Sequence, residues 1–193
     1  MLKRILIWRR NPLWYAVVLF GPIAVLAVAL VISNVSGFTA LSFPAPQKIL
    51  TTFGTVLGVY LLLNTEEIAW RGYALPRLQN RYSPLTATAI IWILWTLFHI
   101  PLFLMKGGHP AGYPFWLYAL LTAGIVVPFT FVFNGTGGSI LFPHMLHQSL
   151  NASVESLPIF PMAAHSIAPI LISTLLLLAI SAFIVLRYRD LKK

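Results

Sequence analysis

Two adjacent carboxylates, Glu66 and Glu67, are half of the acids in this chain, and they directly follow an apolar run. A carboxylate in an apolar, membrane-like environment costs several kcal/mol unless it is paired, protonated or facing water. Two neighbouring carboxylates also resist joint ionisation, which raises that cost. Their presence therefore predicts a compensating cation or a water-filled cavity, in which one carboxylate can act as a general base on water.

Arg71 is the nearest cation to these acids along the chain. Glu67 and Arg71 are four residues apart, so on a helix they lie about 40° apart and can form an ion pair. Glu66 points about 100° away from Glu67 and is free to face another group. From these residues alone, an ion pair at the membrane edge with a solvated Glu66 is an equal alternative.

Histidines on two later apolar runs supply further polar groups. His99 ends one run, and His147 and Asn151 share one helical face of another because they are four residues apart. An imidazole and a carboxamide on one face could hold a polarised carbonyl oxygen or a metal ion. The remaining histidines are expected at the rim of the site or in loops: His144, His109 and His165.

Ionisable groups thus lie on three separate runs. They are expected to converge inside a helix bundle, because exposing them to lipid is costly. A carboxylate and imidazoles in a partly dry cavity form a water-activating arrangement. Glu66, His99 and His147 could also supply the three ligands of a hydrolytic zinc ion. No HExxH pair is present, so the pattern slightly favours a site without metal.

The composition indicates the kind of protein that must position these groups. Of the 193 residues, 59% are apolar and only 9% are charged, against about 25% charged in an average soluble domain. This excludes an ordinary soluble globule and a disordered chain and predicts an integral membrane protein. The chain has no cysteine, which excludes disulfides and thiol catalysis.

Six apolar runs predict an all-α, polytopic transmembrane bundle that forms a single membrane domain over residues 1–193. Each run is near the length that crosses a hydrocarbon core of about 30 Å. The second run should continue as helix past the acids, and its Gly54 and Gly58 predict close helix packing. The fifth run is the least apolar and should be shielded by the others. The runs cover residues 13–32, 49–65, 85–104, 115–133, 139–156 and 165–186.

The basic residues predict the orientation of the bundle. With both termini cytoplasmic, ten Lys or Arg lie in inside segments and two, Lys48 and Lys106, in outside loops, with Arg71 left aside. The formal charge of +9 therefore serves membrane orientation and contact with the lipid bilayer rather than nucleic-acid binding. The ten inside residues are Lys3, Arg4, Arg9, Arg10, Arg77, Arg81, Arg187, Arg189, Lys192 and Lys193.

The polar motifs resemble those of the CPBP intramembrane proteases, the group of CAAX-processing proteases and bacteriocin-processing or immunity proteins also called Abi. The family pattern is EExxxR, then FxxxH, then HxxxN. The matching segments begin at Glu66, Trp95 and His147 in that order, within a core of about residues 50–155. Trp95 stands where the family usually has Phe. This keeps the aromatic bulk beside His99 but changes the shape of the pocket.

The resemblance implies an intramembrane endopeptidase acting on a membrane-associated peptide or protein. Glu66 would be the general base on the attacking water, and His99 would help to hold that water. His147 and Asn151 would stabilise the tetrahedral oxyanion. Glu67 and Arg71 would support the site. The family has been argued both as a glutamate protease without cofactor and as an enzyme dependent on a divalent metal such as zinc.

Two other classes of function compete with the protease. One is a non-catalytic membrane partner on the same fold, such as a bacteriocin-immunity protein or a regulator of a sensor kinase. All the polar motif residues are present, which counts against loss of the chemistry. The other is a proton or metal transporter, for which the sequence shows neither an inverted repeat nor paired broken helices.

Overall fold

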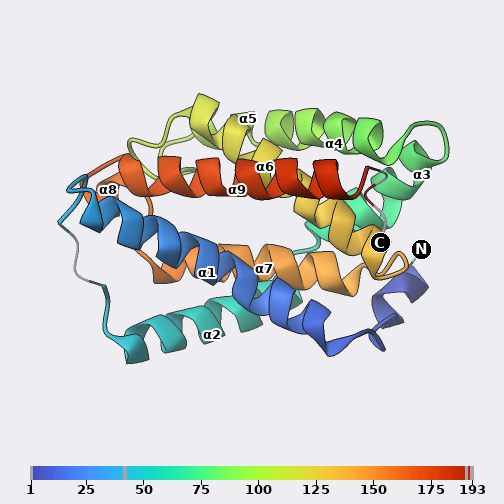
Figure 1. Ribbon diagram of the computed structural model, residues 1–193, viewed down its shortest axis with the longest axis horizontal. Coiled ribbons are helices and arrows are strands. Elements are labelled where there is room, and N and C mark those ends of the chain that lie inside the picture. The colour runs from blue at the N-terminus through green and yellow to red at the C-terminus, as the bar shows by residue number, and fades with distance from the viewer. Residues whose placement is uncertain (1, 41–42, 190, 192–193) are drawn as a thin grey trace.

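The computed structural model describes residues 2–40, 43–189 and 191, and every regular element in this part of the chain is helical (Figure 1). This confirms the predicted all-α class. The elements in chain order are η1 (Leu2–Leu6), α1 (Pro12–Val35), α2 (Pro46–Leu63), η2 (Ile68–Ala74), α3 (Leu75–Gln79), α4 (Pro84–Phe98), α5 (Ile100–Leu104), α6 (Phe115–Gly135), α7 (Leu141–Ser156), α8 (Pro161–Ala164) and α9 (Ala168–Arg187).

The long apolar helices are those of a multi-pass membrane protein. Within the described residues, four stretches are long and apolar enough to span a membrane: α1, α4 with α5, α6 and α9. Helix α2 followed by η2 and α3 forms a fifth, bent by 49°. Helix α7, with 16 residues and a length of about 24 Å, is shorter and less apolar, and it completes the six predicted segments.

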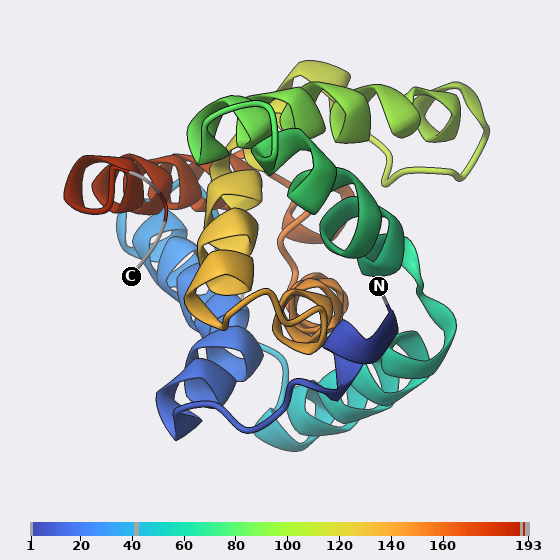
Figure 2. The ribbon, with the colours of Figure 1, turned by 90° about the vertical axis from the view of Figure 1, so that its right-hand side faces the viewer.

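Helix α7 occupies the centre of the bundle. Figure 2 looks along it, and the other helices surround its orange ribbon. His147, Gln148 and Ser149 are buried on it, because polar side chains at this depth are costly against lipid. The expectation that the least apolar segment is shielded by the others is therefore confirmed.

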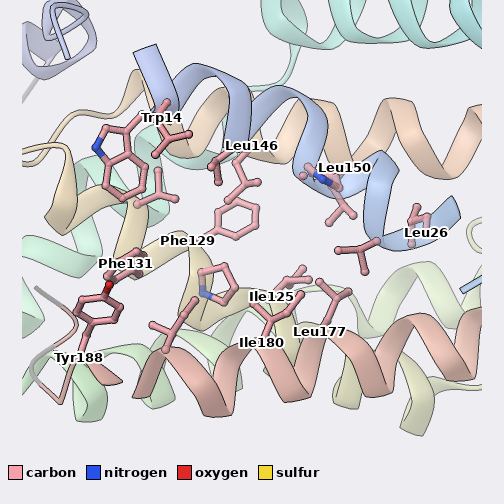
Figure 3. A pocket seen from close by; sticks show the side chains of 18 of the residues that line it. Trp14, Leu26, Ile125, Phe129, Phe131, Leu146, Leu150, Leu177, Ile180 and Tyr188 are labelled. Atoms are coloured by element: carbon pink, nitrogen blue, oxygen red, sulfur yellow. The ribbon is translucent and has the colours of Figure 1, made fainter. Parts of the chain in front are cut away.

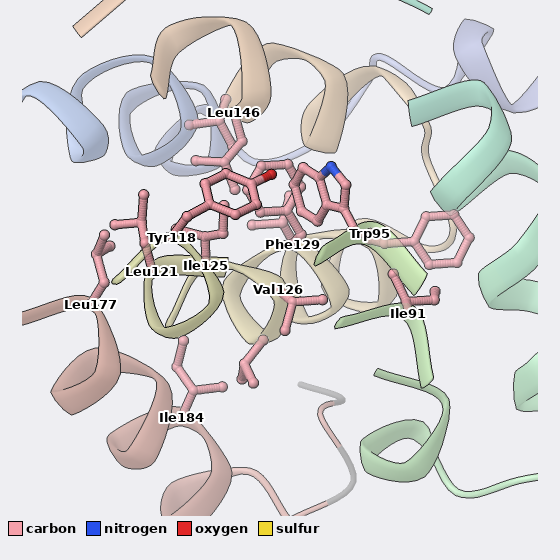
Figure 4. Close-up of a cluster of buried hydrophobic side chains, with 14 of the residues drawn as sticks. Ile91, Trp95, Tyr118, Leu121, Ile125, Val126, Phe129, Leu146, Leu177 and Ile184 are labelled. Carbon is pink, nitrogen blue, oxygen red and sulfur yellow. The ribbon is translucent and has the colours of Figure 1, made fainter. Parts of the chain in front are cut away.

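Helix α6 carries most of the apolar core. Phe129, Ile125 and Val126 pack between Trp95 of α4, Leu146 of α7 and the side chains of α9 (Figure 4). Gly124 allows α9 to approach closely, since a Cβ there would lie 3.0 Å from the Cβ of Leu177. This core holds α4, α6 and α7 at fixed positions around the polar groups.

The helix of the second segment is interrupted just before the acids and resumes through them as far as Gln79, so the expected continuation is helical but not continuous. Helix α2 ends at Leu63, and Asn64 adopts an extended conformation. The Asn64 side chain accepts a hydrogen bond from the backbone N–H of Glu66 at 3.0 Å. Asparagine favours such local bonds over a continuous helix. The chain then winds into the π-helical η2, so both acids directly follow a break within a membrane segment.

Gly54 and Gly58 do not mark a helix contact, which corrects a second expectation. No described atom lies within 4 Å of a Cβ built at either position. The close approach near the acids occurs instead at Gly72, where a Cβ would lie 2.9 Å from the Cδ1 of Ile140. A GxxxG pattern shows that a helix can be approached closely, but the bundle has placed this face outward.

The N-terminal segment and the C-terminal end of α9 lie at the same end of the bundle (Figure 1). The backbone of η1 holds the start of α7, because the N–H of Ile140 donates to the carbonyl of Arg4 at 3.2 Å. The Nε of Arg10 donates to the carbonyl of Thr136 at 2.7 Å. An even number of crossings brings the two ends of a chain to one side in this way.

Candidate active site

Glu67 is the centre of the polar site. It is fully buried, and its Oε1 accepts hydrogen bonds from Arg71 Nη1 and from His147 Nδ1, both at 2.9 Å. The ion pair predicted from the i,i+4 spacing is therefore present. The second bond joins η2 to α7 across 80 positions of sequence, and helix periodicity could not predict it.

The guanidinium of Arg71 is fully buried between two aromatic rings. Its Cζ lies 4.8 Å from the ring centroid of Trp95 and 4.4 Å from that of Phe129. Its Nε and Nη2 have no hydrogen-bond partner among the described residues. Desolvated cation–π contacts contribute up to about 2 kcal/mol each, and tryptophan is the strongest partner. The Trp95 ring therefore covers the buried guanidinium and stabilises its charge.

His147 is oriented by its bond to Glu67. A carboxylate paired with arginine can only accept a hydrogen bond, so Nδ1 of His147 carries the proton. The ring is held edge-on by Trp95 and Phe129, with centroids at 5.3 and 5.7 Å. Its other nitrogen, Nε2, makes no hydrogen bond with the described residues and is therefore available to bind a substrate, a water molecule or a metal. A carboxylate that fixes a histidine in this way is common behind metal-binding and catalytic histidines.

Glu66 has surroundings different from those of Glu67. It is half-buried, and its Oε1 accepts a hydrogen bond from Asn64 Nδ2 at 3.3 Å. Its Oε2 is buried and has no partner among the described residues. The predicted difference in direction between the two acids is thus present: Oε1 of Glu67 is bound by a cation and a histidine, whereas Glu66 has no cationic partner among the described residues. The Oε2 of Glu67 also has no hydrogen-bond partner there, so the two acids differ in their charged neighbours and in burial.

His99 lies at the junction of α4 and α5. Its Nδ1 donates to the carbonyl of Trp95 at 2.9 Å, which leaves Nε2 as an acceptor. The Trp95 ring lies 6.3 Å from the His99 ring and 5.3 Å from the His147 ring, so one side chain contacts both histidines. The structure therefore brings His99 and His147 to a common aromatic neighbour, although no hydrogen bond joins Glu66 to either histidine within the described residues.

His109 lies beside His99, a position that the sequence did not indicate. Its ring stacks on Phe103 at 4.0 Å and lies 6.3 Å from the ring of His99. Burial, and secondarily the neighbouring His99, lower the pKa of His109 below its ordinary value. Gly108 allows the loop to fold back here, since it has no Cβ. A Cβ at this position would overlap the carbonyl oxygen of Leu102. A glycine next to a histidine in an aromatic-rich loop is the signal that could have identified it. His165 is exposed, as expected for a loop residue.

Asn151 belongs to a polar chain along one face of α7. Its Nδ2 donates to Gln148 Oε1 at 3.1 Å, and Gln148 Nε2 donates to His144 Nδ1 at 3.3 Å. His144 Nε2 then donates to the carbonyl of Leu61 at 3.0 Å. Leu61 is in the last turn of α2, where carbonyls lack helical partners. His144 therefore fixes the end of α2 beside the break, and Asn151 keeps a second amide hydrogen for another acceptor.

Replacing His144 by Phe is expected to destabilise the protein by about 1–3 kcal/mol, because the Leu61 carbonyl would lose its only side-chain donor in this network. Thermal unfolding in one detergent measures the change. His165→Phe removes an exposed histidine and is the matched control. Equal melting temperatures for the two variants would contradict the capping role.

The arrangement was tested for a metal site. Among the described residues, no three His, Asp or Glu side chains come close enough together to hold one ion. The Nδ1 bonds of His147 to Glu67 and of His99 to a backbone carbonyl leave Nε2 of each ring available to a metal. It is the separation of the side chains within the described residues that leaves Glu66, His99 and His147 unassembled as one ligand set.

Comparison with known proteins identifies the family of the chain. The family model described as type II CAAX prenyl endopeptidase Rce1-like matches residues 45–153, a range that contains all the residues of the polar site. CAAX prenyl protease 2 of Methanococcus maripaludis is 30% identical over 151 residues, which cover 73% of this chain and 55% of that protein. The chain thus spans about half the length of the curated relative it matches. The resemblance drawn from the motifs is confirmed, and the chain belongs to the Rce1-like family of type II CAAX prenyl endopeptidases.

Proposed function

We propose that this protein is an intramembrane endopeptidase that hydrolyses a peptide bond of a membrane-associated peptide or protein. The observation that carries the proposal is the division of roles between the two acids. Oε1 of the fully buried Glu67 is bound by both Arg71 and His147, whereas Glu66, beside the break, is only half-buried and has no cationic partner among the described residues. A structural ion pair alone would need only Glu67 and Arg71.

Glu66 is the general base in the proposed reaction. It takes a proton from a water molecule that His99 Nε2 helps to hold, and the water oxygen attacks the carbonyl carbon of the peptide bond. Glu66 then returns that proton to the leaving amine, so the proton count closes without a cofactor. General-base catalysis of this kind contributes about 10²–10⁴-fold.

His147 and Asn151 stabilise the oxyanion in this scheme. Asn151 donates its second amide hydrogen. His147 donates from Nε2, which requires the doubly protonated ring, and buried Glu67 stabilises that cation through Nδ1. Aligned donors of this kind act most strongly where water is excluded. Both residues lie on α7, so one rigid helix positions both donors.

The deciding experiment is cleavage of a membrane-tethered fluorogenic peptide by purified protein in detergent, with and without a chelator. We expect cleavage that survives chelation, since no three-ligand set is assembled among the residues that the structure describes. Loss of activity on chelation and recovery with zinc would instead favour a divalent metal held by Glu66, His99 and His147. Absence of cleavage with an intact cellular phenotype would favour the non-catalytic membrane partner.

Replacing Asn151 by Ala is expected to slow cleavage by about 10²-fold or more, because one oxyanion donor is lost. Substrate binding should change little, so the loss should fall on kcat rather than KM. Asn80→Ala, at an exposed residue after α3, is the control. An unchanged kcat for Asn151→Ala would remove it from the oxyanion site.

We also propose that both termini are cytoplasmic. The ten-to-two distribution of basic residues and the shared end of η1 and α9 support this orientation. Cysteines introduced singly at Ser36 and Ser83, for labelling by a membrane-impermeant maleimide, test it. Ser36 should be labelled in intact cells and Ser83 only after lysis, and the reverse pattern would overturn the orientation.

A further inference from the structure

An apolar cavity lies next to the polar site, and Phe129 contacts both. It has a volume of about 340 Å³ and is bounded by α1, α6, α7 and α9 (Figure 3). Its walls are almost wholly apolar, and its volume falls in the range of about 300–1,000 Å³ typical of ligand pockets. Val17 and Ile180 on its walls are 44% and 37% exposed, so it opens sideways toward lipid.

The two ends of this cavity differ in chemistry. Figure 3 shows Trp14, Phe131 and Tyr188 gathered at one end, and Leu26 and Leu177 at the other. Tryptophan and tyrosine place their amphipathic rings at the boundary between headgroups and acyl chains. The aromatic end is therefore the interfacial end, and the leucine end lies deeper in the hydrocarbon.

Exposed arginines are close in sequence to the residues at the aromatic end of the cavity. Arg9 and Arg10 precede the wall residue Asn11, and Arg187 and Arg189 flank the wall residue Tyr188. In sequence, the only acid in these two segments is Asp190. Clusters of basic residues at the interface attract anionic headgroups, at about 1 kcal/mol for each cation near the surface in general.

We propose that this cavity binds one acyl chain of an anionic phospholipid, with the headgroup at the end bearing these arginines. The apolar walls match the chain, the lateral opening lets it enter from the bilayer, and the cations match the phosphate. This site is separate from the peptidase site and does not depend on the proposed hydrolysis.

The bound chain supports the back of the polar site. Phe129 lines the cavity and also packs on Arg71 at 4.4 Å and on His147 at 5.7 Å. Leu146 and Leu150, which line the same cavity, immediately precede His147 and Asn151 on α7. The lipid therefore fills the space behind the helix that presents both oxyanion donors.

Native mass spectrometry of the full chain tests the proposal, with phosphatidylglycerol and phosphatidylcholine as probes. Gly21 lines the cavity, and a Cβ there meets no described atom within 4 Å. Gly21→Leu should therefore fill the cavity and lower the bound fraction of phosphatidylglycerol by about tenfold or more, since the new side chain displaces several methylenes. Gly54→Leu, on the open face of α2, is the matched control and should bind as the parent does.

A second pair of measurements keeps the outcome decisive. If Gly21→Leu melts far below the parent, Val17→Phe fills the same cavity from an exposed wall position. The double variant Arg187→Gln, Arg189→Gln should reduce the preference for phosphatidylglycerol over phosphatidylcholine, with Arg9 and Arg10 retained, and an unchanged preference would exclude these two arginines from the headgroup site. Unchanged phosphatidylglycerol binding by a folded cavity-filling variant would overturn the site. Equal binding of the two lipids by the parent would overturn its anionic preference.

Discussion

Replacing Glu66 by Gln is expected to slow peptide cleavage by at least about 10²-fold while the fold survives. Glutamine keeps the volume of the side chain, and its carbonyl can still accept the 3.3 Å bond from Asn64. It cannot take a proton from water. Because the buried ion pair involves Glu67 and not Glu66, stability should be unaffected. Initial rates on the fluorogenic membrane peptide, at matched protein level, measure the effect.

Two further variants make this result specific. Glu155→Gln changes an exposed acid at the far end of α7 and should cleave at the parental rate. Glu67→Gln should reduce the rate less than Glu66→Gln, because Glu67 acts only through His147, but it should lower the melting temperature because Arg71 is left buried and unpaired. If Glu66→Gln cleaves as fast as the parent, Glu66 is not the base.

Arg71→Ala is expected to destabilise the protein by about 3–5 kcal/mol, because it would leave the carboxylate of Glu67 buried and unpaired. Arg71 and Glu67 are both fully buried, and the guanidinium fills the space between Trp95 and Phe129. Loss of that volume adds a cavity to the cost. Accumulation in the membrane and thermal unfolding in detergent should both fall.

A double variant separates the charge from the volume. Glu67→Gln combined with Arg71→Met removes both charges and leaves a long apolar side chain between the rings, so much of the lost stability should return. Arg81→Ala, at an exposed arginine, controls for the loss of a cation. Normal accumulation and melting of Arg71→Ala would show instead that Arg71 faces the substrate.

The contact between His147 and Glu67 could not be predicted from local sequence spacing. Helix spacing predicted that Glu67 could pair with Arg71, because both positions lie on one short segment. It also placed His147 and Asn151 on one face of a helix. It could not predict that His147 would bind the same carboxylate oxygen as Arg71, because that bond depends on how α7 packs against η2.

The sequence by itself determined the class of protein, its apolar segments and the residues able to do chemistry. Composition sets the class, because a chain with 9% charged residues cannot cover a soluble surface. The cost of charge in lipid then requires Glu66, Glu67, Arg71 and the histidines of the motifs to lie inside the bundle. The Glu67–Arg71 pair follows from helix geometry alone.

Only the tertiary structure decided which helices meet and where α2 ends. In a soluble protein an apolar stripe shows which face of a helix is buried, but membrane helices are apolar on nearly every side. The sequence therefore could not predict that the helix face with Gly54 and Gly58 makes no close contact. It also could not predict that His144 binds the carbonyl of Leu61. The break at Asn64 and the burial of Arg71 between Trp95 and Phe129 likewise depend on packing between segments far apart in sequence. Lipid is as apolar as the helix faces, so hydrophobicity alone does not select which helices pack together.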